Sequence, residues 1–318
     1  MKNHPPIDSG EALELLAAEG ADFYALMARA GSCRERIKGR KIHFCGIINA
    51  KSGRCSENCA FCSQSSHYKT GAPVFPLVSA EAMLERAREV GAMGARAFSI
   101  VTSGTTLRAD QEIAEVCNVI RRLREEGRIM RCASLGTMTE EVLARLKEAG
   151  LTHYHHNLET ARSFFPQICT THEYDDDLRT IKAAKGLGIS VCCGGIFGMG
   201  ETAGQRVELA ETLRELDVDS IPLNFLNPIP GTPLEGGRRI TPQECLKAIA
   251  VYRLMMPQKD IYICGGREVG LRDLHSWIFM AGANGIMVGN YLTTAGRDID
   301  SDRRMIEDQG FELLRYDG

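Results

Sequence analysis

The sequence predicts a (β/α)8 barrel of the TIM type. Short apolar runs alternate with amphipathic helical patterns of ten or more residues, and eight such runs can be counted. Strict alternation of strand and helix indicates a parallel sheet with right-handed crossovers, and eight units favour closure into a barrel. A doubly wound open sheet is the alternative fold. Because barrels bind ligands at the carboxyl ends of their strands, we expect functional side chains where each apolar run ends.

The predicted elements follow one another along the chain. Two amphipathic helical stretches, 10–18 and 21–30, precede the first strand. The expected strands are 42–48, 96–102, 129–134, 152–158, 189–195, 220–226, 261–265 and 285–289. Capping side chains such as Ser79, Thr139 and Thr241 mark the helix starts between them. We therefore expect an N-terminal helical extension (1–40), a barrel (41–294) and a C-terminal tail (295–318).

Composition and charge exclude several classes of protein. The chain has 318 residues, of which 44% are hydrophobic and 25% charged, as in ordinary globular proteins. Its 38 Lys and Arg against 41 Asp and Glu give a net charge of −3, with no dense basic run, so we expect neither nucleic acid nor membrane as a partner. The polar start and the absence of a long apolar stretch predict a cytoplasmic protein. A small-molecule substrate is expected.

Three of the twelve cysteines are closely spaced after the first strand, in the pattern Cys55-x3-Cys59-x2-Cys62. In a reducing compartment cysteines favour metal binding, catalysis or burial over disulfides. Iron–sulfur and zinc sites normally use four protein ligands, so three thiolates on one loop leave a corner open for another molecule. The alternative is a structural zinc site that a distant Cys or His completes.

The loop, with Phe61 before its last cysteine, resembles the signature of the radical S-adenosylmethionine (SAM) superfamily. Further blocks resemble the biotin synthase family and occur in the family's order. These blocks are 55–65, 68–71, 154–160, 194–201, Asn224 with 231–234, 266–268 and 280–284. The resemblance extends from about 51 to 294.

The resemblance implies the cofactors, the reaction and the partners. Cys55, Cys59 and Cys62 would hold a [4Fe-4S] cluster whose fourth iron binds SAM. Reductive cleavage of SAM would give a 5′-deoxyadenosyl radical that removes hydrogen from dethiobiotin, and an auxiliary iron–sulfur cluster would supply the sulfur of biotin. Relatives also suggest flavodoxin or ferredoxin as the electron donor, and a homodimer.

The resemblance further implies which residues contact SAM and substrate. For SAM these are Asn157, Glu159, Gly194, Ile196, Glu201 and His172, the last standing where many relatives carry an arginine that pairs with the SAM carboxylate. For dethiobiotin they are Asn224, Asn157 and His155, since neutral amides match a ureido ring. The alternatives are structural: strand capping for Asn157 and Glu159, a turn for Asn224, and packing for the histidines.

The auxiliary site departs from the family pattern, which uses three cysteines and one arginine on a [2Fe-2S] cluster. The chain keeps Cys132 and Cys192, but Ser99 and Tyr262 stand at the other two positions. Cys264 lies two residues after Tyr262 and therefore faces the same side of its strand. We expect Cys132, Cys192 and Cys264 to bind a four-iron cluster with sulfide on its remaining iron, in preference to a [2Fe-2S] cluster.

Alternatives remain for the auxiliary site and for the function. Cys193 or Ser99 could complete a two-iron site, although Cys193 should point outward by strand alternation. The rival functions are another radical SAM barrel enzyme, such as a hydrogenase-cofactor maturase, and a non-catalytic zinc-stabilised barrel that binds a ligand.

Overall fold

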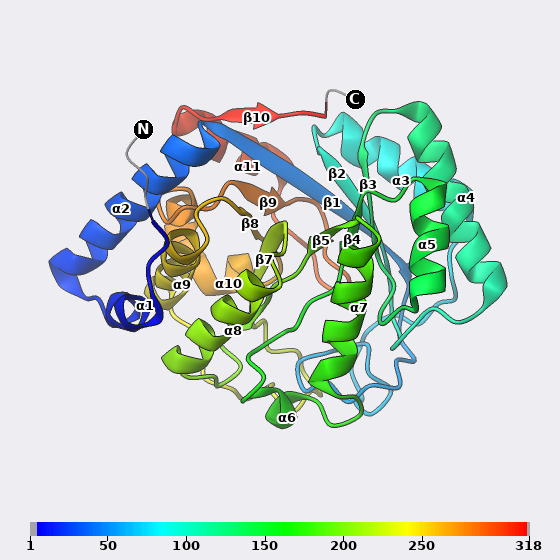
Figure 1. Cartoon of the computed structure of the whole chain (residues 1–318), viewed down its shortest axis with the longest axis horizontal. Helices are drawn as coiled ribbons and strands as arrows, with labels where there is room; N and C mark the ends of the chain where they lie inside the picture. The colour runs from blue at the N-terminus through cyan, green and yellow to red at the C-terminus, as the bar shows by residue number, and fades with distance from the viewer. Residues whose placement is uncertain (1–4, 317–318) are drawn as a thin grey trace.

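The computed structural model describes residues 5–316 and confirms the predicted (β/α)8 barrel. Parallel strands pair in the order β1-β2-β3-β4-β5-β7-β8-β9, and β9 pairs with β1 to close the barrel (Figure 1). Residues 1–4 and 317–318, at the ends of the predicted extension and tail, lie outside the described residues.

The barrel strands are short and the helices surround them. The strands are β1 (Lys41–Lys51), β2 (Ala97–Thr102), β3 (Met130–Ser134), β4 (His153–His155), β5 (Ser190–Cys192), β6 (Gly195–Phe197), β7 (Ser220–Phe225), β8 (Asp260–Ile263), β9 (Gly285–Met287) and β10 (Glu312–Leu314). The helices are α1 (Ser9–Leu16), α2 (Gly20–Lys38), α3 (Ala80–Ala92), α4 (Asp110–Glu126), α5 (Glu140–Ala149), α6 (Phe165–Ile168), α7 (Tyr174–Gly186), α8 (Ala203–Glu215), α9 (Pro242–Met255), α10 (Arg267–Leu271), the 3₁₀ helix η1 (Arg272–Ile278) and α11 (Ile299–Asp308).

The expected fifth strand, 189–195, is divided into β5 and β6. Between them the backbone passes so close to β7 that a Cβ atom on Gly194 would lie 1.9 Å from the carbonyl oxygen of Pro222. Only a glycine fits there without moving β7. The expected fourth strand is also shorter than predicted, because β4 ends at His155.

The core lies between the barrel and its helices. Outward-facing strand residues such as Phe44 and Phe98 are fully buried there. Helix α4 presents Ile113, Val116 and Ile120 to this core at helical spacing. Burying each such side chain contributes about 1.5–3 kcal/mol. Because the outward faces supply this stability, the inward faces can carry other side chains.

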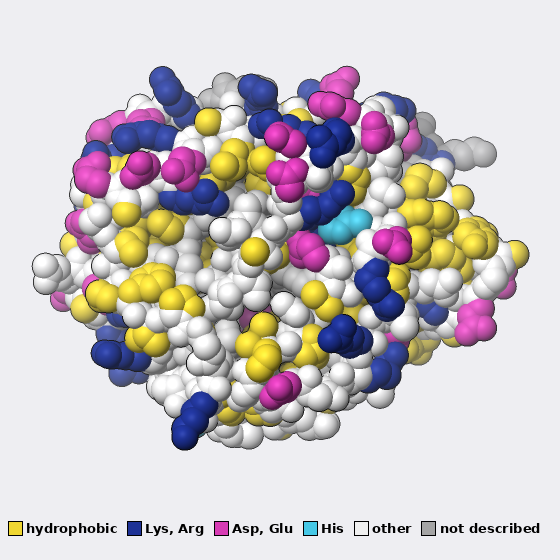
Figure 2. Space-filling model, turned by 180° about the vertical axis from the view of Figure 1, so that it is seen from behind, with side chains coloured by type: hydrophobic (Ala, Val, Ile, Leu, Met, Phe, Trp, Pro, Cys, Tyr) yellow, Lys and Arg dark blue, Asp and Glu magenta, His cyan; other side chains and the backbone are white. Residues whose placement is uncertain are grey.

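The two ends of the chain pack on the outside of the barrel. Helices α1 and α2 lie against α8 and α9, and β10 pairs with β1. A fully buried ion pair between Arg267 and Asp302 anchors α11. Basic and acidic side chains are interspersed on the face shown in Figure 2. Among residues 5–316, no helix combines the length and apolarity that crossing a bilayer requires.

Candidate active site

A cavity of about 540 Å³ lies inside the barrel and opens at the carboxyl ends of its strands. Side chains from the barrel strands line it, together with the loop that follows β1. Its mouth carries the loop cysteines, and its interior carries cysteines of the strands themselves. The site therefore lies where the fold class predicts a ligand site.

The loop after β1 directs Cys55, Cys59 and Cys62 into this cavity. The Cys55 N–H donates to the Gln64 carbonyl at 3.1 Å, and the Cys62 N–H donates to the Cys59 carbonyl at 2.9 Å. Burial raises the pKa of Cys62 to about 11, so a thiolate there needs a nearby positive charge. Iron supplies such charge, and three thiols facing one space fit a [4Fe-4S] cluster with one open corner.

The spacing of the loop thiols disfavours the zinc alternative. A zinc ion with Zn–S bonds of about 2.3 Å brings its sulfurs to within about 4 Å of one another. Within residues 5–316, one group of three or more Cys, His, Asp or Glu has all its ligand atoms within 4.8 Å of one another, and it does not include Cys55, Cys59 or Cys62. The wider spacing fits a polynuclear cluster.

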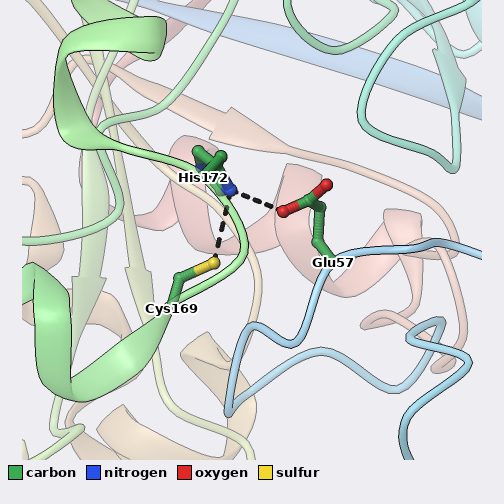
Figure 3. Close-up of side chains that lie close together, drawn as sticks. All are labelled: Glu57, Cys169 and His172. Atoms are coloured by element: carbon green, nitrogen blue, oxygen red, sulfur yellow. Dashed lines mark hydrogen bonds and ion pairs between the residues drawn. The ribbon is translucent and has the colours of Figure 1, made fainter.

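The compact group consists of Glu57, Cys169 and His172 (Figure 3). The Nδ1 atom of His172 lies 2.7 Å from Glu57 Oε2 and 3.3 Å from Cys169 Sγ. Cys169 Sγ in turn lies 3.7 Å from Cys59 Sγ. Sequence reasoning missed this contact, although the position of Glu57 inside the cysteine motif was a signal for it.

A second carboxylate fixes the other side of the His172 ring, where Nε2 lies 3.4 Å from Asp177 Oδ2. Hydrogen bonds to Asp177, Cys169 and Glu57 outweigh burial and raise the pKa of His172 to about 11. Its ring is therefore cationic at neutral pH. Asp177 also contacts His156 Nε2 at 2.8 Å. His172 lines the cavity, but protein groups already contact both of its ring nitrogens.

Asn157 and Glu159 line the cavity from the loop that follows β4, not from the strand itself as predicted. Glu159 has a φ angle of 60°, in the left-handed region that few non-glycine residues adopt. Such strain persists where the surroundings enforce it, often at functional sites. Burial raises the pKa of Glu159 to about 8. Asn157 donates to Glu159 Oε2 at 3.3 Å and accepts from the Gly194 N–H at 3.1 Å.

Of the SAM contacts predicted between 194 and 201, one lines the cavity and two lie behind its wall. Ile196 lines the cavity, whereas Gly194 and Glu201 are not among its lining residues. The Glu201 carboxylate accepts from the N–H groups of Gly198 and Met199 and pairs with Arg206 at 2.8 Å. It therefore shapes the loop after β6.

The predicted substrate residues Asn224 and His155 both line the cavity. Asn224 accepts from the Gly265 N–H at 2.9 Å and donates to the Gly195 carbonyl at 3.3 Å. A primary amide has two N–H donors, so these contacts leave one N–H of Asn224 for a ligand. Burial lowers the pKa of His155 to about 4, so this ring is neutral at physiological pH.

The interior of the cavity, which we call the inner chamber, is lined by Cys132, Cys192 and Cys264, together with Cys45 from β1. Burial raises the pKa of Cys132 and of Cys264 well above the usual value for a thiol, so both are neutral thiols unless a metal binds them. The sequence alone predicts no ligand role for Cys45 and favours a small buried thiol there. The signal was strand alternation, since Cys45 and Ile47 face the cavity on β1.

A neighbouring residue, Ser99, indicates that the inner chamber suits a bound group. Ser99, which pairs in register with Cys132, has a buried hydroxyl with no hydrogen-bond partner. A buried polar atom without a partner is costly, and sulfides of a cluster would provide one. Cys193 does not line the cavity, and its side chain is fully buried in the core.

Comparison with known proteins agrees with this arrangement. Residues 50–213 match the family model "Radical SAM superfamily", and residues 222–312 match "Biotin and Thiamin Synthesis associated domain". Among solved structures, methylornithine synthase superposes with a TM-score of 0.83 at 20% identity, covering 98% of this chain and 95% of that one. HydG, a maturase of the [FeFe]-hydrogenase, superposes with a TM-score of 0.81 at 18% identity, covering 96% of this chain and 72% of that one. At such identities the likeness shows the fold alone.

Curated relatives are much more similar in sequence. Biotin synthase of Citrifermentans bemidjiense is 57% identical over 308 residues, covering 97% of this chain and 94% of the relative. Biotin synthase of Geobacter sulfurreducens is 56% identical over 312 residues, covering 98% of this chain and 95% of the relative. The hydrogenase-maturase and zinc-barrel alternatives are therefore not supported. The chain belongs to the biotin synthase family of radical SAM enzymes.

Proposed function

We propose that the chain converts dethiobiotin to biotin inside this cavity, with sulfur taken from an auxiliary cluster in the inner chamber. Bound at the mouth, the [4Fe-4S] cluster and SAM would supply a carbon radical able to abstract hydrogen from unactivated carbon. The observation that carries the proposal is the presence of two separate sets of thiols on one cavity, the loop set and the inner set. Family membership supports the reaction.

The cavity residues between the two sets would bind and orient SAM and substrate. Glu159 and Asn157 offer a carboxyl group and an amide to the ribose hydroxyls of SAM, and Ile196 offers an apolar surface to its adenine. Gly194 and Glu201 do not line the cavity, and they would act by fixing the backbone conformation of the segment 194–201 that contains Ile196. The enclosed barrel excludes water, which protects a radical from side reactions.

The substrate residues match the ureido ring by hydrogen bonding without charge. The free N–H of Asn224 would donate to the ring carbonyl, and Asn157 and neutral His155 would complete the polar contacts. His172 would act on SAM by its positive charge, since its ring nitrogens already contact protein groups.

The auxiliary cluster would be held by Cys132, Cys192 and Cys264. These three cysteines are one ligand short of the four that a [2Fe-2S] cluster needs, and neither the outward Cys193 nor the weak donor Ser99 supplies the fourth well. A four-iron cluster would keep three thiolates and carry a transferable sulfide on its remaining iron. This proposal stands on the donor set and on the unpartnered Ser99 hydroxyl.

The partners follow from the resemblance to the family. We propose flavodoxin or ferredoxin as the electron donor, a homodimer as the working form, and the cytoplasm as the compartment. The extension 1–40, the barrel 41–294 and the tail 295–318 would work as one unit, in keeping with the packing of α1, α2 and α11 on the barrel.

The test is anaerobic incubation with SAM, reductant and dethiobiotin, followed by mass spectrometry. Biotin together with 5′-deoxyadenosine is expected. Formation of 5′-deoxyadenosine without biotin would point to another radical SAM reaction. Zinc in place of iron, with neither product, would support the non-catalytic barrel.

A further inference from the structure

Cys45 is a fourth cysteine that faces the inner chamber. It lies on β1 and lines the same cavity as the three proposed ligands of the auxiliary cluster. Its neighbour Phe44 points the other way and is fully buried in the core. Among residues 5–316, the remaining cysteines that line the cavity are the three of the loop at the mouth and Cys169, which lies beside that loop.

The strand register shows the height of Cys45 in the barrel. Cys45 pairs with Ala97 of β2, and Ala97 pairs with Met130 of β3. Cys132 lies two residues further along β3. In an eight-stranded barrel the side chains of alternate strands form one layer, with a stagger of about one residue per strand. Cys45 and Cys132 therefore belong to the same layer.

The same comparison of strand register places Cys192 in the layer of Cys132. Cys132 pairs with His153 of β4, His153 pairs with Ser190 of β5, and Cys192 lies two residues after Ser190. Three thiols from alternate strands β1, β3 and β5 thus lie in one layer of the barrel. A set of ligands that converges in this way could not be recognised by sequence spacing.

The fourth member of the layer is Tyr262, and Cys264 lies two residues further toward the mouth. Cys192 pairs with Ser220, Ser220 pairs with Asp260, and Tyr262 lies two residues further on. Cys264 follows Tyr262 by two residues and lines the cavity. Three thiols in one layer and a fourth that is two residues nearer the mouth therefore line the same cavity.

Tyr262 leaves this space open. Its ring lies against Gly285, where an added Cβ would come within 2.4 Å of a ring carbon. Its hydroxyl lies 3.1 Å from His43 Nδ1, two residues before Cys45 on β1. The Tyr262 side chain is thus held against β9 and β1 and does not fill the space between the four thiols.

We infer that Cys45 and sulfide alternate as ligands of the fourth iron of the auxiliary cluster. The inference rests on the proposed function, in which Cys132, Cys192 and Cys264 bind the other three irons. Once the sulfide has been consumed, Cys45 binds the exposed iron and releases its thiol proton to solvent. Hydrosulfide then reloads the site: an iron–sulfide bond forms, the iron–Cys45 bond breaks, and the hydrosulfide proton passes to Cys45. No electron is transferred in either exchange.

This role has a physical reason. Iron–sulfur clusters are normally held by four protein ligands, and an iron without a ligand is readily lost. Without Cys45, each turnover would leave one iron of the cluster bound by sulfides alone. A fourth thiol in the same chamber retains that iron until sulfide returns.

The test measures iron retention in anaerobically reconstituted protein. Wild type, Cys45→Ala, Cys264→Ala and a control, Cys193→Ala, are loaded either with stoichiometric sulfide or with excess sulfide. SAM is added to each to bind the fourth iron of the cluster at the mouth, and the proteins are then exposed to an iron chelator. Cys193 is a suitable control because it is a buried cysteine that does not line the cavity. Iron is counted per chain, and Mössbauer spectra identify the remaining clusters.

Wild type and Cys193→Ala should keep about eight irons per chain in both forms. Cys45→Ala should keep them with excess sulfide but fall to about seven with stoichiometric sulfide, because only the fourth iron of the auxiliary cluster then lacks a ligand, and the Mössbauer spectrum should show a three-iron cluster. Retention by Cys45→Ala in both forms, or loss in both forms, overturns the exchange. Failure of the proposed function looks different: wild type itself would lack a four-iron auxiliary signal, or Cys264→Ala would keep all its irons.

Discussion

The cysteine loop at the mouth and the inner chamber both present thiols to one cavity, but they are built in opposite ways. Cys55, Cys59 and Cys62 lie on one short loop, and local backbone hydrogen bonds fix its shape. The inner thiols come from strands far apart in sequence, and barrel register alone brings them together. The loop can therefore change without disturbing the barrel, whereas each inner cysteine depends on the whole barrel for its place.

The two regions also differ in their depth in the cavity, and this indicates how they divide the chemistry. Cys55, Cys59 and Cys62 lie on the loop that follows β1, whereas Cys132 and Cys192 lie on barrel strands. An electron has to enter from outside, so the cluster that receives it belongs at the mouth. A sulfide held for transfer must be kept from solvent, which favours the inner chamber. Substitutions in the two regions should accordingly separate SAM cleavage from sulfur insertion.

The largest effect is expected at the loop. Cys55→Ala, Cys59→Ala or Cys62→Ala should each abolish SAM cleavage and with it biotin formation, because each removes a ligand of the cluster that binds SAM. The barrel should stay folded, since the loop lies outside the core, and circular dichroism checks this. Wild-type amounts of 5′-deoxyadenosine from any one of the three variants would show that the cluster is assigned to the wrong residues.

Substitution in the inner chamber should abolish biotin formation and leave SAM cleavage in place. Cys264→Ala should continue to cleave SAM but lose biotin formation, because radical generation needs only the cluster at the mouth. Mass spectrometry of 5′-deoxyadenosine and biotin from the same reaction measures both. The matched variant Cys193→Ala should form both products, since Cys193 faces the core. Equal biotin yields from Cys264→Ala and wild type would contradict a role for Cys264 in sulfur supply.

The contrast between these regions also explains what the sequence could predict. The barrel was predictable because eight apolar runs alternate with helices, and the grouping of the loop thiols because the three cysteines lie within eight residues. The division of the fifth strand at Gly194 depends on the approach of β7, which is a tertiary contact. Similarly, Cys45 belongs to the site through register, and Cys169 through its contact with Cys59, neither of which spacing reveals.

A moderate effect is expected at Asn224, between the two regions. Asn224→Ala should weaken dethiobiotin binding by about ten- to a hundredfold, because a buried carbonyl that loses its donor costs ~1–3 kcal/mol. SAM binding should change less. Calorimetric titration of each ligand measures the two affinities. An equal loss for both ligands would indicate that Asn224 acts by holding Gly195 and Gly265 in place.

The smallest effect concerns the charge of Glu159, whose pKa burial raises to about 8. In the unfolded chain a glutamate titrates near ~4.3, so between these values the unfolded state has lost a proton that the folded state retains. The unfolded state then binds fewer protons, and stability falls as pH rises through this window. Glutamine has a similar shape and cannot ionise, so Glu159→Gln should remove this part of the pH dependence.

Thermal unfolding of the anaerobic protein at several pH values measures this effect. The melting temperature of Glu159→Gln relative to wild type should increase from about pH 5 to about pH 8, by several degrees, since ~1 kcal/mol moves Tm by about 2–4 °C in large domains. A difference that stays constant over this range would mean that Glu159 ionises in the folded protein as it does in water. The Glu159 side chain would then contact the SAM ribose as a carboxylate anion, and it could not act there as a hydrogen-bond donor.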